Sequence, residues 1–193
     1  MPLPPGRPAR PAACHSSGCG GPPELSIFVP VTTADEILIR PARPADMPEV
    51  AGIWHAGWPD GHLGHVPDEL VAIRTADSFR PRAADRTADT RVAEVDGEIA
   101  GFTMVVDDEV EQVYVAAAHR GSGVADELLA DAERRIREGG HRRAWLAVVA
   151  GNARARRFYE RRGWVDDGPI VYAAEGPDGA IDVRAQRYVK DLT

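Results

Sequence analysis

The chain has 193 residues, of which 23 are basic and 30 acidic, so its formal net charge at pH 7 is −7. This length suits one domain with a sizeable core. The acidic balance argues against a protein that coats nucleic acid, because such binding rests on neutralising phosphates with Lys and Arg. No apolar run approaches the roughly 18 residues of a membrane-spanning helix, so we expect no membrane partner.

The first 35 residues differ in composition from the rest. They are dense in proline and glycine and lack hydrophobic periodicity, which predicts a disordered tail, or an overextended start, ahead of a domain over 36–193. The continuous apolar core of a secretory signal is missing. Both cysteines lie here beside His15, but they leave a zinc site incomplete, so we expect no metal. A domain without disulfides suits a reducing cytoplasm.

A short strand and a helix open the domain. Residues 37–40 predict the strand, and a helix follows whose apolar positions recur at helical spacing at Val50, Ile53, Trp54 and Gly57. Residues 54–67 bring three histidines and two tryptophans among glycines and prolines, which predicts a structured loop between two helices.

A second helix is expected from Pro67. Proline suits a helix start, and Leu70, Ile73 and Phe79 would share one face. Residues 80–90 are polar and irregular, so we expect a mobile connection there.

The clearest hairpin joins residues 91–95 to residues 98–106. Its turn, Asp96-Gly97, matches the twist of antiparallel strands. After a second turn, residues 109–115 predict the next strand of an antiparallel meander. Side chains alternate along a strand, so residues 109, 111, 113 and 115 are predicted on one face, which directs Glu109 and Glu111 the same way.

A small, flexible segment follows this strand and leads into a helix over 124–138. Such a strand–loop–helix junction gathers unpaired backbone N–H groups and the positive end of the helix dipole, so it can bind a phosphate or diphosphate. Gly121 and Gly123 permit close approach and positive φ. The sequence patterns of the nucleoside triphosphatase P-loop and of the GxGxxG dinucleotide loop are both absent.

The last part of the chain alternates strand, helix and two strands. Residues 144–149 are apolar throughout, as in a strand covered on both faces. Asn152 suits the N-cap of the next helix, and the closing strands are expected over 170–175 and 181–189.

Two segments about thirty residues apart resemble motifs of one enzyme family. Residues 120–125, read as R-x-x-G-x-A, resemble the pyrophosphate-binding motif [RQ]-x-x-G-x-[GA] of the Gcn5-related N-acetyltransferases, the GNAT family. Residues 152–164 are similar to that family's N-x-x-A-x-x-F-Y-x-x-x-G-[FW] segment. The resemblance covers roughly residues 37–192. It departs modestly at Ala117, where proline is frequent, and at Ala125, where glycine is commoner.

The resemblance implies an α/β fold: a mixed, mostly antiparallel twisted sheet with helices on both faces and a cofactor cleft between two splayed strands. It also implies acetyl transfer from acetyl-CoA to a primary amine by direct attack in a ternary complex. The residues that it assigns to cofactor binding are Val113, Tyr114, Val115, Arg120, Gly121, Ser122, Gly123, Val124, Ala125 and Asn152.

Three residues receive catalytic roles from the resemblance. Only a free-base amine attacks a thioester, so a carboxylate must accept its proton. Glu109 falls nearest the family's strand glutamate and Glu111 is a close competitor, while either residue could be a solvated acid. Tyr159 matches the tyrosine that protonates the leaving thiolate, with plain packing as the alternative.

The acceptor side is less determined. In the family, the loop placed here at 54–67 faces the acceptor, which assigns Trp54, Trp58 and His62 to substrate binding. Packing within the loop and a metal site around His62 and His65 stay open. We favour a small-molecule amine; a protein N-terminus or lysine, and a non-catalytic acyl-CoA sensor, are the alternatives. Oligomeric state is open and includes a homodimer.

Overall fold

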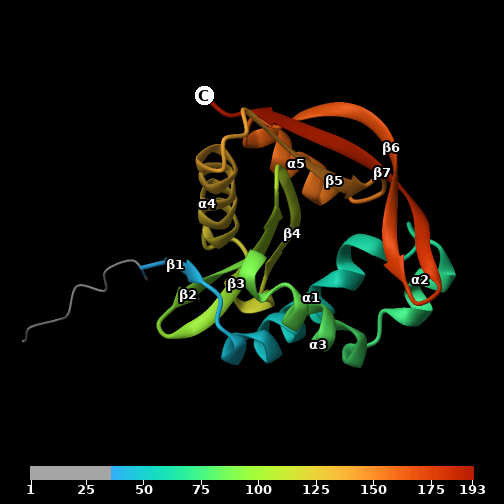
Figure 1. Ribbon diagram of the computed structural model, residues 1–193, viewed down its shortest axis with the longest axis horizontal. Helices are drawn as coiled ribbons and strands as arrows, with labels where there is room; N and C mark the ends of the chain where they lie inside the picture. Colours follow the sequence, from blue (N-terminus) through green and yellow to red (C-terminus); the bar gives the residue numbers. More distant parts are fainter. Residues whose placement is uncertain (1–35) are drawn as a thin grey trace, which may run out of the picture. The chain divides into compact units, whose positions relative to one another are not determined.

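The computed structural model describes residues 36–193, and the expected tail and incomplete zinc site fall outside these residues. The described part forms a seven-stranded sheet in the order β1-β2-β3-β4-β5-β7-β6 (Figure 1). Only β4 and β5 pair in parallel; the other neighbours are antiparallel. The strands are β1 (Leu38–Pro41), β2 (Thr90–Val95), β3 (Glu98–Val106), β4 (Glu109–Val115), β5 (Arg143–Val149), β6 (Val165–Gly176) and β7 (Gly179–Asp191).

Helices cover both faces of this sheet. The α-helices are α1 (Met47–His62), α2 (Asp68–Ile73), α3 (Ala76–Asp85), α4 (Val124–Glu138) and α5 (Ala153–Arg161), with 3₁₀ turns at η1 (Pro44–Asp46), η2 (Thr87–Asp89) and η3 (Ala117–His119). One core cluster joins α1 and α3 to β2 and β3, and a second joins α4 and α5 to β5 and β7. Among the described helices, none is both long and apolar enough to cross a membrane.

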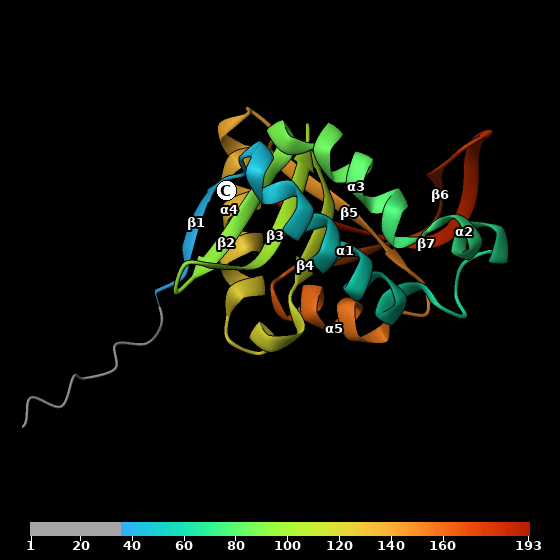
Figure 2. The same ribbon diagram turned by 90° about the horizontal axis from the view of Figure 1, so that it is seen from below.

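The mixed sheet with helices on both faces confirms the expected fold class. The turn between β2 and β3 has φ of 52° at Asp96 and 83° at Gly97, the two positive values that a tight hairpin requires. The closing hairpin of β6 and β7 is present, but both strands are longer than expected. It extends toward α2 in Figures 1 and 2.

The expected loop over 54–67 is wrong for most of its length, because α1 continues to His62. Trp54 and Trp58 are buried at helical spacing, and this burial outweighs the weak helix propensity of the glycines around them. The glycines permit close packing: a Cβ at Gly57 would lie 2.7 Å from the Tyr114 ring, and one at Gly61 would lie 2.6 Å from the side-chain amide of Asn152.

The expected mobile connection over 80–90 is also wrong. Residues Ala76–Asp85 form α3, which lies beside α1 in Figures 1 and 2. Phe79 is fully buried, and its ring meets that of Trp54 edge-on, with centroids 5.3 Å apart. The helix expected from Pro67 is therefore divided into α2 and α3, although Leu70, Ile73 and Phe79 still pack in one core cluster.

The two parallel strands diverge almost at once. Glu109 opposite Trp145 is the only paired position between β4 and β5 among the described residues, and Trp145 N–H donates to the Asp108 carbonyl at 3.0 Å. From there to Val115, the β4 edge that faces β5 has no partner strand within residues 36–193. The splayed strands of the expected fold are therefore present (Figure 1).

A β-bulge in β4 corrects the expected side-chain alternation. Met104 lies opposite Gln112 and Val105 opposite Val110, so Glu111 is the extra residue. Val110 and Val113 both pack in the cluster with α4, although they are three positions apart. Glu109 and Glu111 therefore lie on the opposite face of β4, with Gln112 and Tyr114. The expectation that they share a face with Val113 and Val115 is wrong.

Candidate active site

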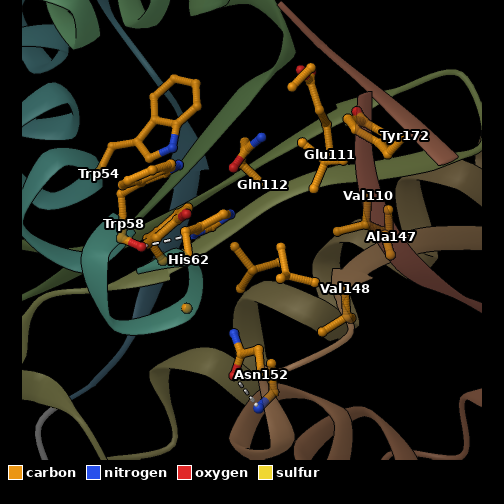
Figure 3. Close-up of a pocket in the computed structure, with 18 of the residues that line it drawn as sticks. Trp54, Trp58, His62, Val110, Glu111, Gln112, Ala147, Val148, Asn152 and Tyr172 are labelled. Carbon is orange, nitrogen blue, oxygen red and sulfur yellow. Dashed lines mark hydrogen bonds between the residues drawn. The ribbon is translucent and has the colours of Figure 1, made fainter. Parts of the chain in front are cut away.

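Two adjoining cavities lie along the gap between β4 and β5. The first, with a volume of about 440 Å³, contains Glu109 and Glu111 in its wall and is called here the carboxylate cavity (Figure 3). The second, of about 400 Å³, is bounded by the glycine segment and α5 and is called the loop cavity. Six residues line both: Gly61, Val113, Tyr114, Asn152, Ala155 and Tyr159.

The wall of the loop cavity carries free backbone donors. Gly121 and Gly123 have φ of 86° and 94°, and a Cβ at Gly121 would meet no atom within 4 Å. Within residues 36–193, no protein group accepts a hydrogen bond from the N–H of Gly121, Gly123, Val124 or Ala125. Four donors at the start of α4, together with its dipole, form a site suited to a phosphate or diphosphate.

The side chains of this segment contribute unequally. Arg120 lines the loop cavity and forms a 2.7 Å ion pair with Asp60 of α1. The Ser122 hydroxyl instead donates to the His119 carbonyl at 2.7 Å, and its side chain does not line the cavity. The Val124 side chain is fully buried, so only backbone groups of Val124 are available to a ligand.

The start of α5 places two expected site residues at the junction of the cavities. Asn152 caps the helix by accepting from Ala155 N–H at 3.0 Å. Tyr159 packs between the rings of Trp164 and Tyr188, at centroid distances of 6.1 and 6.3 Å. Loss of water around its hydroxyl raises the pKa of Tyr159 to about 12, so this group is protonated at neutral pH.

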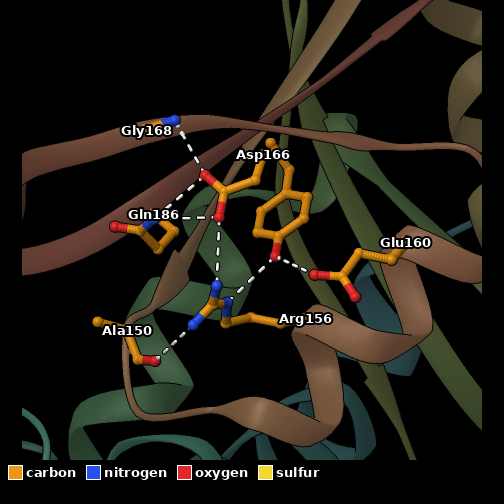
Figure 4. A network of polar contacts seen from close by, with 7 residues as sticks. Ala150, Arg156, Glu160, Asp166, Gly168 and Gln186 are labelled. Atoms are coloured by element: carbon orange, nitrogen blue, oxygen red, sulfur yellow. Dashed lines mark hydrogen bonds and ion pairs between the residues drawn. The ribbon is translucent and has the colours of Figure 1, made fainter.

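A polar network that sequence reasoning missed holds α5 against β6 and β7 (Figure 4). The Tyr188 hydroxyl accepts from Arg156 Nε at 3.1 Å and donates to Glu160 at 2.8 Å. Arg156 also bonds to Asp166 at 3.2 Å, and Asp166 accepts from Gln186. The network fixes the helix from which Tyr159 projects.

The two glutamates have different partners. Glu109 accepts a 3.0 Å hydrogen bond from the hydroxyl of Tyr172 in β6. Glu111 lies 3.2 Å from Arg86, which also pairs with Asp89. Burial raises the pKa of both carboxyl groups; the Tyr172 bond opposes this effect at Glu109, and Arg86 opposes it at Glu111. Partly desolvated carboxylates of this kind are suited to accept protons near neutral pH.

The three residues expected at the acceptor all line the carboxylate cavity from α1. Trp54 and Trp58 also belong to the core, at 3% and 7% exposed. His62 stacks on Trp58 with ring centroids 4.6 Å apart, and burial lowers its pKa, which favours neutral imidazole. No group of three or more potential metal ligands occurs in the described part of the chain.

Several residues in the carboxylate cavity were not anticipated. Arg74, Arg82 and Arg86 come from the segment that was expected to be partly mobile, and Tyr172 and Glu175 come from β6. The density of arginine over 74–86 was the available signal. Nothing local in the sequence showed that these side chains meet β4 and β6.

Comparison with known proteins identifies the family. The profile of the Acetyltransferase (GNAT) family matches residues 50–164, more than half of the chain. An uncharacterized N-acetyltransferase of Mycobacterium tuberculosis (strain ATCC 25618 / H37Rv) is 29% identical over 116 residues, covering 55% of this chain and 74% of the relative. A protein from Mycobacterium bovis with the same description matches equally.

Solved structures show the same fold. A GCN5-related N-acetyltransferase from Rhodopseudomonas palustris superposes with a TM-score of 0.65 at 20% identity, over 83% of this chain and 98% of that one. A putative acetyltransferase from Salmonella typhimurium, solved with its cofactor acetyl-CoA, gives 0.59 at 20% identity, over 82% and 95%.

The fold and the family match together define an acyltransferase. The chain belongs to the GNAT family of N-acetyltransferases. The acetyl donor of that family is acetyl-CoA. The residues of the loop cavity fit the diphosphate of acetyl-CoA. Four backbone N–H groups are unpaired within residues 36–193, and Gly121 has no side chain that would occupy the space a ligand needs.

Proposed function

We propose that this enzyme transfers acetyl from acetyl-CoA to the primary amine of a small molecule by direct attack in a ternary complex. One observation carries the proposal: the gap between β4 and β5 joins a loop with four free backbone N–H groups to a cavity with two partly buried carboxylates. Every residue involved lies in residues 36–193, so we also propose that these residues form the N-acetyltransferase domain.

The cofactor end would be held by backbone and by Arg120. The free N–H groups of Gly121, Gly123, Val124 and Ala125, with the Arg120 guanidinium, would bind the diphosphate. The unpaired β4 edge from Val113 to Val115 offers backbone groups to an extended arm, as in strand addition. Asn152, at the junction of the cavities, would contact the same arm. When bound, acetyl-CoA supplies the thioester that the amine attacks.

Glu111 is the base in this proposal. An ammonium group must lose a proton before its nitrogen can attack. Glu111 stands two residues from Val113, at the start of the unpaired edge, whereas Glu109 is two residues farther and already bonded to Tyr172. Arg86 pairs with the Glu111 carboxylate but also with Asp89, so its positive charge is shared between two carboxylates. Glu109 would be a secondary acceptor.

Tyr159 is the acid. Its hydroxyl is protonated at neutral pH and lies where the two cavities join. It would donate its proton to the sulfur as the carbon–sulfur bond breaks. Neither cavity is lined by a described Ser or Cys side chain, which favours direct attack over an acyl-enzyme.

The shape of the carboxylate cavity supports a small acceptor. A volume of about 440 Å³ lies in the range of small-molecule sites. Trp54 and Trp58 wall it on the α1 side, and Tyr172 of β6 lies across from them (Figure 3). An extended polypeptide acceptor would call for an open groove at this place.

Isothermal titration of acetyl-CoA tests the cofactor end, beside a Gly121→Glu, Gly123→Glu double variant that places two carboxylates in the loop cavity. We expect binding to the parent and its loss in the variant, with circular dichroism unchanged. A thiol-release assay over a panel of small amines then tests transfer. If acetyl-CoA binds neither protein, or binds but no small amine releases thiol, the proposed function is overturned.

A further inference from the structure

We propose that the acceptor carries a carboxylate as well as its amine, and that Arg74, supported by Arg82, binds that carboxylate in the carboxylate cavity. The inference rests on the proposed function, and it narrows the acceptor to amino-acid-like molecules. It arises from an imbalance among the charged side chains that line the cavity.

The three arginines of the cavity differ in how their charge is compensated. Arg86 pairs with Glu111 and Asp89. Arg82 pairs at 3.0 Å with Glu175, whose side chain is 74% exposed, and the buried Arg82 Nε has no hydrogen-bond partner in the described part of the chain. Arg74 forms no ion pair with any residue in 36–193; its only hydrogen bond donates to the Glu175 backbone carbonyl at 2.7 Å.

The surroundings of Arg74 disfavour an unpaired cation. Burial and the neighbouring Arg82 lower the pKa of Arg74 to about 10, and Glu175 only partly opposes them. A guanidinium in this position gains more from an anionic partner than one in water, because burial weakens solvent screening. A carboxylate matches its planar fork and would also approach Arg82.

The charges of an amino-acid-like acceptor fit the whole cavity. Its ammonium would face Glu109 and Glu111, and its single negative charge would compensate the one arginine that has no carboxylate partner. A polyamine with no anionic group would instead place extra positive charge near three guanidinium groups. Arg82 is held in place by stacking over Trp54, with its guanidinium carbon 5.4 Å from the ring centroid.

A matched pair of acceptors tests the inference: amino acids and their C-terminal amides, which differ only in the carboxylate. We expect kcat/KM to favour the acids by about 10-fold or more, since a site built for a polar group rejects the analogue that lacks it. Arg74→Gln should reduce this ratio to about 1 without changing acetyl-CoA affinity, and Arg74→Lys should restore part of it. Arg80→Gln is the control, because Arg80 is 74% exposed on α3 and outside the cavity.

The outcomes separate the two proposals. If amides are acetylated as well as acids, or the preference survives in Arg74→Gln, the carboxylate inference is overturned while the transferase function stands. If acetyl-CoA does not bind the parent, the proposed function fails first. If neither the amino acid nor its amide is acetylated, isothermal titration of each into the CoA-saturated protein measures the same preference as an affinity ratio. Equal affinity for the acid and the amide, or no binding of either, overturns the inference.

Discussion

The loop cavity and the carboxylate cavity adjoin, yet they are built in different ways. The donors of the loop cavity are backbone N–H groups of one short segment, those of Gly121, Gly123, Val124 and Ala125. The charged side chains of the carboxylate cavity come from β4, β6 and residues 74–86. A short local motif therefore specifies the first, whereas the second exists only after distant elements pack together.

This difference predicts that the two cavities have separate roles. Cofactor affinity should depend on the loop cavity, whereas proton transfer and acceptor selectivity should depend on the carboxylate cavity. Helix α1 reaches both, since Asp60 pairs with Arg120 while Trp58 lines the other cavity. A variant that changes only cofactor affinity or only acceptor turnover would support these separate roles. A variant that changes both would contradict them.

The largest effect is expected for Glu111→Gln. Removing the proton acceptor should lower kcat/KM by about 10² to 10³-fold, within the usual range for general base catalysis. Glutamine keeps the size of the side chain, so acetyl-CoA affinity should not change. Thiol release and isothermal titration measure the two quantities. An equal loss of kcat/KM in Glu109→Gln would assign the base role to both residues. A loss of acetyl-CoA affinity in Glu111→Gln would contradict the separate roles of the two cavities.

A smaller loss is expected for Tyr159→Phe, because sulfur is a good leaving group even without an acid. We expect kcat to fall by about 10 to 10²-fold, with little change in acetyl-CoA affinity. Phenylalanine keeps the ring contacts with Trp164 and Tyr188. An unchanged thermal midpoint would show that packing is intact. Full activity with an intact fold would leave Tyr159 with a packing role only.

The sequence predicted the parts of the fold that local rules control. Asp96-Gly97 specifies a hairpin turn, and Asn152 caps α5 through its own side chain. The bulge at Glu111 depends on how β3 and β4 pair, so the period of two directed both glutamates the same way but wrongly placed them on the face of Val113 and Val115.

Long-range packing explains the remaining errors. The glycines and prolines of residues 54–67 indicated a loop, but in the fold the missing side chain of Gly57 lets α1 pack against Tyr114. The Arg74 guanidinium is positioned in the carboxylate cavity by its hydrogen bond to the backbone carbonyl of Glu175, which is 101 residues away in the sequence. Neither contact can be read from neighbouring residues, which is why the acceptor side was only partly anticipated.

Asp60→Asn tests the connection between the cavities. The Asp60 carboxylate holds Arg120 and would compete with a bound diphosphate. Both side chains are partly exposed, so the pair contributes at most about 1 kcal/mol and its loss should tighten acetyl-CoA binding by about 2- to 5-fold. Titration at low and high salt checks this, because the gain should shrink at high salt. Weaker binding would show that Asp60 positions Arg120 for the cofactor instead.

The smallest effect concerns stability. Burial raises the pKa of Glu109 in the folded protein above its unfolded value, so the folded state binds the proton more tightly. The resulting stabilisation is present below the unfolded pKa, about 4.3, and is lost as pH rises through the folded pKa. At pH 7.5 the buried charge therefore lowers the free energy of unfolding.

Glu109→Gln removes that charge and can still accept the Tyr172 hydrogen bond. We expect the thermal midpoint of the variant to exceed that of the parent by about 2 °C at pH 7.5, and the difference to vanish near pH 4. Differential scanning calorimetry at the two pH values measures it. Glu98→Gln, at an exposed end of β3, should show no such pH-dependent difference. A variant less stable than the parent at pH 7.5 would mean that the Tyr172 bond outweighs desolvation.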